Sequence, residues 1–322
     1  MRCRITRQTD AAVAVLKAGG VVALPTETVY GLGASTFDPQ AVSRIFAAKQ
    51  RPLFDPLIVH IAAQDWLPQV AADFPDQARK LAEKFWPGPL TIVLPKNPAV
   101  PDLVTSGLPT VGVRVPDHPV MQKVLQEFGK PIAAPSANLF GRLSPTTVEH
   151  VLEQLGDRIE LVLDGGPCRV GVESTIVQFA GENGRILRPG GISQEELEAV
   201  IGPLTTTVKE LSPAEPLAPG RLPCHYAPRT PIQITKKIPM SATPGEPRGV
   251  LLWHPRAVQG YAAVEILSYN SNLAEAALNF FPALHRLDAA GLSQILAEPF
   301  PEHGLGRTLN DRLHRASAAF PS

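Results

Sequence analysis

The sequence predicts a mixed α/β protein with two domains. Three observations predict this class: apolar segments of strand length alternate with amphipathic segments of helix length, glycine and proline separate these segments, and a proline-rich polar stretch at 203–231 interrupts the alternation. The chain has 322 residues, of which 44% are hydrophobic and 19% charged, which is enough for a large core. We therefore expect a first domain at 1–202, a linker at 203–231 and a smaller C-terminal α/β domain at 232–322.

The stretch VVALPTETVYGLGA is the central segment of the first domain. Its apolar start predicts a buried strand that delivers Thr26, Glu27 and Thr28 to its carboxyl end, where α/β proteins usually bind their ligands. Gly31 and Gly33 are predicted to let the backbone turn sharply after this polar segment. A strand followed by an ordinary glycine turn is the simpler interpretation of the same residues.

The other elements of the first domain follow from capping signals and hydrophobic periodicity. Asp38 is a natural N-cap with Pro39 at the first helical position, and Ser193 with Glu196 forms a capping box. Together the patterns predict helices beginning at Thr9 or Asp10, Asp38, Gln77, His118, Ser144-Pro145 and Ser193, and strands over 57–61, 90–94, 111–115, 131–135, 161–164, 173–177 and 185–189.

The C-terminal part repeats the alternation on a smaller scale. Apolar segments at 250–253, 265–267 and 293–296 predict strands, and the patterns at 273–287 and 304–316 predict helices. The linker before them contains PGRLPCHYAP, which places an arginine, a histidine and Tyr226 between turn formers. A simple spacer has no need of these side chains.

The composition excludes several classes of function. Lysine plus arginine equals aspartate plus glutamate, at 30 each, so no overall positive field attracts nucleic acid or an anionic membrane. Cys3, Cys168 and Cys224 are widely spaced and odd in number, which favours a reducing compartment and gives no zinc-ligand spacing. Apolar runs are shorter than the roughly 18 residues that span a bilayer. We expect a cytoplasmic protein without membrane contact.

Charged residues inside apolar segments are the strongest chemical signal. Arg114 lies within VGVRV and His60 within LIVHI, and an unpartnered buried charge costs several kcal/mol. The alternatives are a structural salt bridge for Arg114 and a satisfied core histidine for His60. Lys49 and Arg51 end a helix and can simply complement its dipole, and Arg188 at a strand exit is equally ambiguous.

Polar residues at strand ends and turns accompany these basic groups. They are Ser136, Asn138, Ser144, Ser174 and Thr175. Guanidinium forks, an ammonium group and hydroxyls suit carboxylate and phosphate, so the set predicts a pocket for a polyanion. The sequence lacks a P-loop, a dinucleotide fingerprint and a nucleophile elbow, and we expect no covalent nucleophile. Catalysis by positioning and charge neutralisation remains, as in nucleotidyl transfer.

Six motifs in one order resemble a known family. They are LPTETVYGLGA, K-x-R-P with PLIVH, WPGPLT, VRVP, APSAN and GVESTI. They are similar to the YrdC-like domain of threonylcarbamoyl-AMP synthases, and the HYAP segment with the C-terminal GLG and NDRL motifs resembles the two-domain form. The resemblance implies a YrdC-like mixed α/β domain joined by the proline-rich linker to a smaller Rossmann-like α/β domain.

The resemblance also implies an activity. L-threonine, bicarbonate and ATP, with Mg²⁺ on the phosphates, are converted to threonylcarbamoyl-adenylate and pyrophosphate. A threonylcarbamoyl transferase machinery then modifies the adenosine beside the anticodon of certain tRNAs, and a weak tRNA contact is possible. Alternatives are an RNA- or tRNA-binding module without synthase activity, which the balanced charge disfavours, and a carbamoyl-handling maturation factor, which usually carries further segments that this chain lacks.

Motif by motif, the resemblance implies two sets of site residues. The L-threonine set is Thr28, His60, Arg114, Ala134 and Ser174, with Arg114 as the carboxylate partner. The ATP set is Lys49, Arg51, Asp55, Thr110, Ser136, Ser144, Arg188 and Tyr226, with Tyr226 as part of a lid. Asp55 departs from the asparagine that is common in the family, and a carboxylate there repels triphosphate unless it contacts ribose, is protonated or acts through magnesium.

Overall fold

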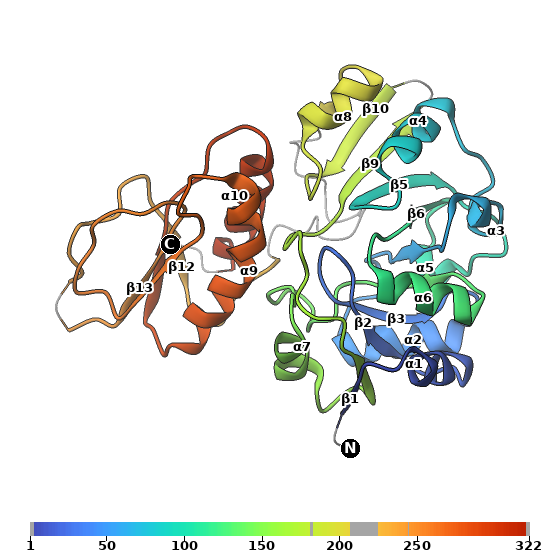
Figure 1. The fold of residues 1–322 in the computed structure, drawn as a ribbon, viewed down its shortest axis with the longest axis horizontal. Helices are drawn as coiled ribbons and strands as arrows, with labels where there is room; N and C mark the ends of the chain where they lie inside the picture. The colour runs from blue at the N-terminus through green and yellow to red at the C-terminus, as the bar shows by residue number, and fades with distance from the viewer. Residues whose placement is uncertain (1–2, 181–182, 207–224, 244, 320–322) are drawn as a thin grey trace.

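The computed structural model describes residues 3–180, 183–206, 225–243 and 245–319. Figure 1 shows two α/β bodies side by side, with the smaller C-terminal one on the left. The large body contains a mixed sheet in the order β1-β8-β2-β3-β7-β4-β6-β5-β9-β10-β11. In that order its strands are Arg4–Thr6, Leu161–Leu163, Val22–Leu24, Gly31–Ser35, Ile132–Ala133, Ile58–His60, Thr110–Arg114, Leu90–Pro95, Thr175–Ala180, Asn183–Arg188 and Thr205–Thr206.

Helices cover both faces of this sheet. They are α1 Thr9–Lys17, α2 Pro39–Lys49, α3 Leu67–Val70, α4 Asp76–Phe85, α5 Asp102–Thr105, α6 Pro119–Phe128, α7 Val148–Leu155 and α8 Gln194–Ile201. Alternate residues of one strand face different layers. Val22 and Leu24 pack with α1 and α6, whereas Ala23 belongs to the larger core on the opposite face, which also contains residues of α2 and α7. The expected mixed α/β class is therefore confirmed.

The structure corrects the prediction for the central stretch. Residues 31–35 form β3, antiparallel to β2, so Gly31 and Gly33 do not make a sharp turn. The chain reverses earlier, between the end of β2 and the start of β3. A Cβ atom on Gly33 would lie 2.6 Å from Leu24 Cδ1 and 2.9 Å from Ile132 Cγ2, so this glycine allows close strand packing.

The predicted start of the helix at Ser144-Pro145 is also wrong by three residues. Helix α7 begins at Val148, and Thr147 is its N-cap, with the side chain accepting from the His150 amide. The Ser144 hydroxyl instead donates to the Glu173 carboxylate at 2.5 Å. A serine that has a tertiary partner is thus not available for local capping.

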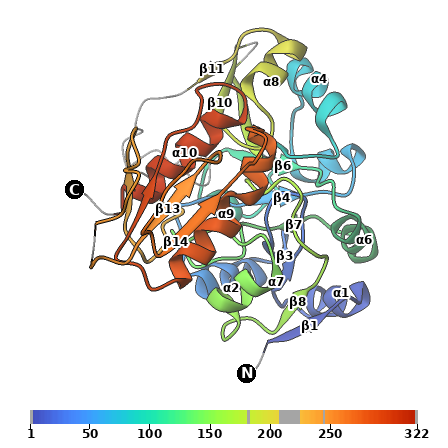
Figure 2. The same cartoon turned by 60° about the vertical axis from the view of Figure 1, so that its left-hand side comes forward.

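The smaller body contains a parallel sheet in the order β12-β15-β13-β14. In that order its strands are Ile232–Ile234, Gln294–Ala297, Arg248–Leu252 and Ala263–Ile266, and its helices are α9 Leu273–Ala289 and α10 Leu305–Ser317. Figure 2 shows α9 and α10 stacked in front of the large body. Their core includes Val29, Val172 and Tyr226, so the two bodies share one hydrophobic cluster.

Part of the expected linker has a defined structure. Thr205–Thr206 forms the edge strand β11 beside β10, and His225 with Tyr226 is buried at the junction of the two bodies. The rest of the linker segment at 207–224, including Cys224, lies outside the described residues. Over the described residues, every helix is too short or too polar to cross a membrane.

Candidate active site

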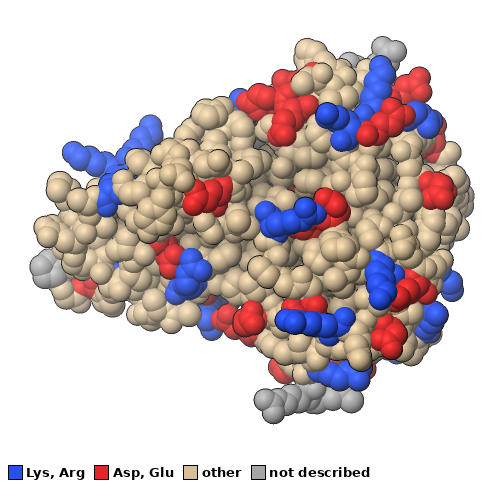
Figure 3. All heavy atoms as spheres, in the orientation of Figure 1, with Lys and Arg blue, Asp and Glu red and all other residues tan. Residues whose placement is uncertain are grey.

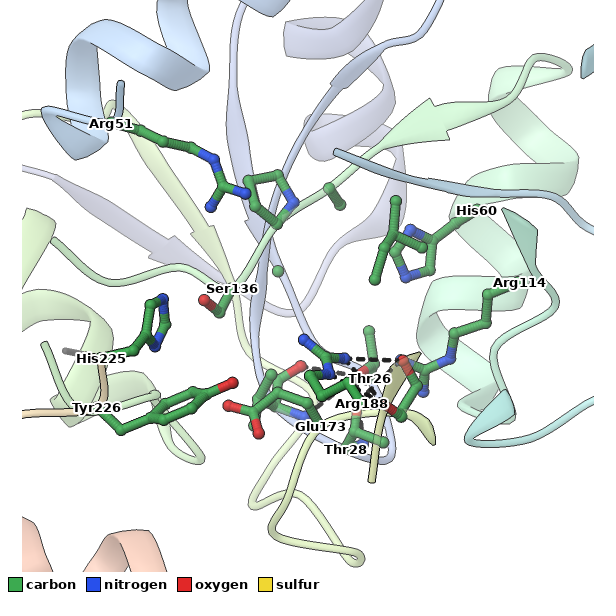
Figure 4. A pocket seen from close by; sticks show the side chains of 16 residues that line it. Thr26, Thr28, Arg51, His60, Arg114, Ser136, Glu173, Arg188, His225 and Tyr226 are labelled. Atoms are coloured by element: carbon green, nitrogen blue, oxygen red, sulfur yellow. Dashed lines mark hydrogen bonds between the residues drawn. The ribbon is translucent and has the colours of Figure 1, made fainter. Parts of the chain in front are cut away.

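A cavity opens where the polar strand ends meet. Figure 4 shows His60 and Arg114 on one side, Arg51, Ser136, His225 and Tyr226 on the other, and Arg188 between them. The lining comes from the segment between β2 and β3, from β3, β4, β6 and β10, from the segments that follow α2 and β7 and precede β9, and from His225 and Tyr226. It comprises Thr26, Thr28, Val29, Gly31, Arg51, Ile58, His60, Arg114, Ala134, Pro135, Ser136, Glu173, Ser174, Arg188, His225 and Tyr226.

Arg114 is the central cation of the first side. Its Nη2 lies 2.6 Å from Glu27 Oε1, and both side chains are at most 4% exposed. Nη1 donates to Thr28 Oγ1 at 3.0 Å and Nε to the Gly88 carbonyl at 3.3 Å. The sequence left open whether Arg114 forms a structural salt bridge or a ligand site. It does form a salt bridge, and it lines the cavity as well.

His60 lies beside Arg114 on the neighbouring parallel strand. Burial, together with the nearby Arg114 charge, lowers the pKa of His60 to about 3. The imidazole is therefore neutral at physiological pH, and its Nδ1 has no hydrogen-bond partner among the described residues. A buried neutral ring with an unpartnered nitrogen beside a guanidinium is suited to a polar ligand group.

Thr26 fixes the hydroxyl of Thr28. Thr26 Oγ1 donates to the Val29 carbonyl at 2.6 Å and lies 2.9 Å from Thr28 Oγ1. The Thr28 hydroxyl in turn contacts Arg114. The turn thus orients one wall of the cavity through a chain of hydrogen bonds.

Ser174 and Arg188 form the middle of the cavity. Arg188 Nη2 donates to the Ser174 carbonyl at 2.8 Å and to its hydroxyl at 3.2 Å. The Ser174 hydroxyl also lies 2.8 Å from Thr91 Oγ1. Burial lowers the pKa of the Arg188 guanidinium.

Lys49 supports the second side from behind. Its Nζ donates to the carbonyls of Ser136 at 2.5 Å and Asn138 at 2.6 Å, and the side chain is fully buried. Burial, and next the Arg51 charge, lower the pKa of Lys49. Because carbonyl oxygens surround the ammonium group, Lys49 anchors the corner that presents Ser136 to the cavity.

Arg51 forms a buried ion pair with Asp55. Its Nη2 lies 2.9 Å from Asp55 Oδ2, and each side chain is 3% exposed. Burial raises the pKa of Asp55, and the charges of Arg51, Lys49 and Arg188 oppose this rise. Arg51 lines the cavity, whereas Asp55 lies behind it.

Glu173 connects the cavity to the C-terminal body. Its Oε1 accepts from Ser144, and its Oε2 accepts from Arg312 Nε at 2.8 Å. Arg312 of α10 is completely buried, donates from Nη2 to the Pro189 carbonyl at 2.8 Å, and lies 4.8 Å from the Tyr226 ring centroid. Burial favours a raised pKa for Glu173, but Arg312, Arg188 and the Ser144 hydroxyl hold it below its usual range.

The cavity brings together nine of the thirteen predicted site residues. All five of the threonine set line it, and so do Arg51, Ser136, Arg188 and Tyr226 of the ATP set. Lys49, Asp55 and Ser144 lie behind lining residues. Thr110 lines a separate small pocket beside β6.

The two predicted sets of site residues omit four residues that shape the cavity: Thr26, Glu27, Glu173 and Arg312. All four stand within the quoted motifs, and Thr26 and Glu27 belong to the polar strand end that was already expected to lie at a ligand site. Arg312 occupies a helix whose pattern resembles an ordinary amphipathic surface helix. Its complete burial depends on packing against the other body.

The arrangement suits a small zwitterion and a polyphosphate held together. Tyr226 Oη and His60 Nδ1 lack partners among the described residues, and both line the cavity beside guanidinium groups. Within the described part of the chain, no group of three or more His, Cys, Asp or Glu residues is arranged to hold a metal ion. These features define an α/β protein with a buried cationic pocket that is suited to anionic ligands.

Comparisons with known proteins agree with this class. The Sua5/YciO/YrdC family model, described as "Telomere recombination", matches residues 14–190, and the model described as "Threonylcarbamoyl-AMP synthase, C-terminal domain" matches residues 192–318. The chain belongs to the threonylcarbamoyl-AMP synthase family in its two-domain form. The prediction of a synthase is thus confirmed, and the alternative of an RNA-binding module is not supported.

Relatives cover almost the whole chain. The threonylcarbamoyl-AMP synthase of Pyrococcus abyssi is 42% identical over 95% of this chain and 93% of its own length. That of Bacillus subtilis is 42% identical over 95% of this chain and 92% of its own. The crystal structure of P. abyssi Sua5 complexed with L-threonine is similar with a TM-score of 0.90 and 38% identity, covering 98% of each chain.

Proposed function

We propose that this chain converts L-threonine, bicarbonate and ATP to threonylcarbamoyl-AMP and pyrophosphate. The observation that carries the proposal is one cavity with a guanidinium at each side, Arg114 with His60 on one side and Arg51 on the side that also holds Tyr226, and Arg188 between them. Such spacing suits an amino-acid carboxylate at one side and a triphosphate at the other. The threonine bound to the P. abyssi relative supports the amino-acid side.

On the amino-acid side, Arg114 binds the threonine carboxylate. Its Nε and Nη1 already have partners in Gly88 and Thr28, so the guanidinium is held in one orientation before the ligand arrives. His60, Ala134 and Ser174 bind the rest of the amino acid. The neutral His60 forms a hydrogen bond with the amino acid without adding charge to the site.

On the nucleotide side, Arg51 and Arg188 neutralise phosphate charge, and Ser136 and Tyr226 complete the contacts. Lys49, Asp55 and Ser144 support this side, and Thr110 is the least direct member of the set. Tyr226 covers the nucleotide as a lid and excludes water from the labile intermediates.

The reaction has two steps. The threonine ammonium and bicarbonate give a carbamate, a water molecule and a proton. A carbamate oxygen then attacks the α-phosphorus of ATP, and the bond to pyrophosphate breaks. Guanidinium groups fixed around the phosphates favour this step because they stabilise the charge that develops on the leaving group.

We propose that Mg²⁺ binds together with ATP, since the phosphate oxygens supply its preferred hard ligands. The cytoplasm is the proposed compartment, in line with the free Cys3 and Cys168. A threonylcarbamoyl transferase machinery that acts on tRNA is the proposed consumer of the product. We also propose the division into a catalytic domain at 1–202, a linker at 203–231 and a C-terminal domain at 232–322.

Pyrophosphate release tests the proposal. Release should require threonine, bicarbonate and ATP together, and serine should replace threonine poorly. Arg114→Ala should sharply lower threonine-dependent release. Release that ignores threonine or bicarbonate would contradict the proposed function while leaving the fold unaffected.

A further inference from the structure

The loop after α2 is closed by the side chain of Arg51. Arg51 Nε donates to the Asp55 carbonyl at 3.1 Å, and Nη2 donates to the Pro56 carbonyl at 2.8 Å. The same Nη2 lies 2.9 Å from Asp55 Oδ2, and the Asp55 amide donates to the Pro52 carbonyl at 3.3 Å. The loop therefore holds one edge of the guanidinium, while Arg51 lines the cavity.

Asp55 is placed among the cations of the nucleotide side. Asp55 is 2% exposed, and the positive charges of Arg51, Lys49 and Arg188 act on its carboxylate. It does not line the cavity itself. A carboxylate has no donor for phosphate, so its direct effect on a triphosphate is repulsion. Its function must therefore be sought in what it does to Arg51.

We propose that Asp55 is a positioning residue for the nucleotide reaction, which orients Arg51 and sets the balance between nucleotide affinity and turnover. The inference rests on the proposed function. With no nucleotide bound, Asp55 compensates the Arg51 charge and keeps the free edge of the guanidinium toward the cavity. With ATP bound, it limits the net attraction, so that the charged product pyrophosphate leaves rapidly.

The other side of the cavity contains the same arrangement, which supports the inference. Glu27 lies 2.6 Å from Arg114, is equally buried, and also stays behind the lining. Arg51 and Arg114 thus each have a resident carboxylate. The two pairs allow a comparison of two variants. Replacing Asp55 should change KM for ATP, and replacing Glu27 should change KM for threonine.

The test is Asp55→Asn, which keeps the shape and the acceptor toward Arg51 but removes the charge. In steady-state pyrophosphate release, we expect KM for ATP to fall about tenfold, because one repulsive charge near the phosphates is gone. We expect kcat to fall about threefold, because tighter binding of the ground state and of pyrophosphate slows turnover. KM for threonine should stay unchanged.

The controls separate charge from position. Asp65→Asn removes a carboxylate from an exposed position of the same domain and should alter neither parameter. Glu27→Gln should change KM for threonine and leave KM for ATP unaltered. In an Arg51→Met background, Asp55→Asn should have no further effect on ATP binding, because Asp55 acts through Arg51.

A binding measurement keeps the test independent of activity. The rise in melting temperature caused by ATP should be larger for Asp55→Asn than for the unmodified protein. A higher KM for ATP, unchanged ATP parameters, or additive effects with Arg51→Met would each overturn the inference. If the unmodified protein neither binds ATP nor releases pyrophosphate, it is the proposed function that fails.

Discussion

The two sides of the cavity are supported by different parts of the molecule. On the amino-acid side, Arg114 contacts Gly88, Thr28 and Glu27, all from the large body. On the nucleotide side, Glu173 and Tyr226 both contact Arg312 of the C-terminal body. The C-terminal body therefore acts on the site mainly through the nucleotide side, and the amino-acid side depends on the large sheet.

Further contacts strengthen this difference. Thr308 donates to the Gly190 carbonyl at 2.9 Å, just after Arg188, and His285 Nε2 lies 3.2 Å from the Ser144 carbonyl. Arg312 itself donates a hydrogen bond to the Pro189 carbonyl. Residues of α9 and α10 thus fix the backbone on which the nucleotide side is built. The charges on the face shown in Figure 3 are mixed in sign, so the buried residues carry this electrostatic organisation.

Arg114→Ala should have the largest effect, on the amino-acid side only. Loss of a buried guanidinium that binds a carboxylate should lower kcat/KM for threonine by about 1,000-fold. Arg114→Lys keeps the charge without the fork and should recover part of this loss. ATP affinity, measured by calorimetry, should change less than threefold in Arg114→Lys. An equal loss on both sides would contradict the comparison.

Arg312→Met tests the support from the C-terminal body. Leaving Glu173 without its partner should lower the free energy of unfolding by about 3 kcal/mol, since one member of a buried ion pair is removed. Among the proteins that remain folded, KM for ATP should rise more than KM for threonine. Arg307→Met on the same helix is the control, because its pair with Glu195 is half exposed. A larger effect on threonine would reverse the assignment.

Tyr226→Phe should have a smaller effect, because only the unpartnered hydroxyl is removed and the ring still packs against Arg312. We expect KM for ATP to rise about fivefold through the loss of one hydrogen bond to a charged group. Tyr226→Ala should in addition raise ATP hydrolysis that is not coupled to threonine. Unchanged coupling in Tyr226→Ala would rule out the proposed lid.

The smallest expected effect concerns the His150–His285 stack between the two bodies. The ring centroids are 3.7 Å apart, and burial lowers the pKa of His150 from 6.5 to about 3. Between about pH 3 and pH 6.5, His150 of the unfolded chain therefore binds a proton that His150 of the folded protein does not bind. The free energy of unfolding should fall as pH drops below 6.5, by about 1.4 kcal/mol per pH unit for each such proton.

His150→Phe should reduce this slope by one proton while keeping the stacked contact. Urea denaturation at pH 7.5, 6.5 and 5.5 measures it. His60 has a similarly lowered pKa, so a residual slope is expected in the variant. An identical slope in both proteins would show that the stack contributes nothing to acid sensitivity.

Much of the site could be predicted from the sequence because its residues occur in short local motifs. Charged residues inside apolar segments, such as Arg114 and His60, and hydroxyls at strand ends, such as Ser174, identified the cavity wall. The misplaced elements have a common cause. The glycines of β3 and the hydroxyl of Ser144 serve tertiary contacts, and local turn or capping preferences do not include partners distant in sequence.

The sequence by itself determined the class, the order of the elements and the chemical character of the pocket. These follow from hydrophobic periodicity and from the residue types that carry charge, both of which are local properties. Only the tertiary structure decided the pairing of each arginine with its carboxylate, Arg114 with Glu27 and Arg312 with Glu173. The latter pair joins residues 139 positions apart, and its formation depends on how two separately folded sheets pack together.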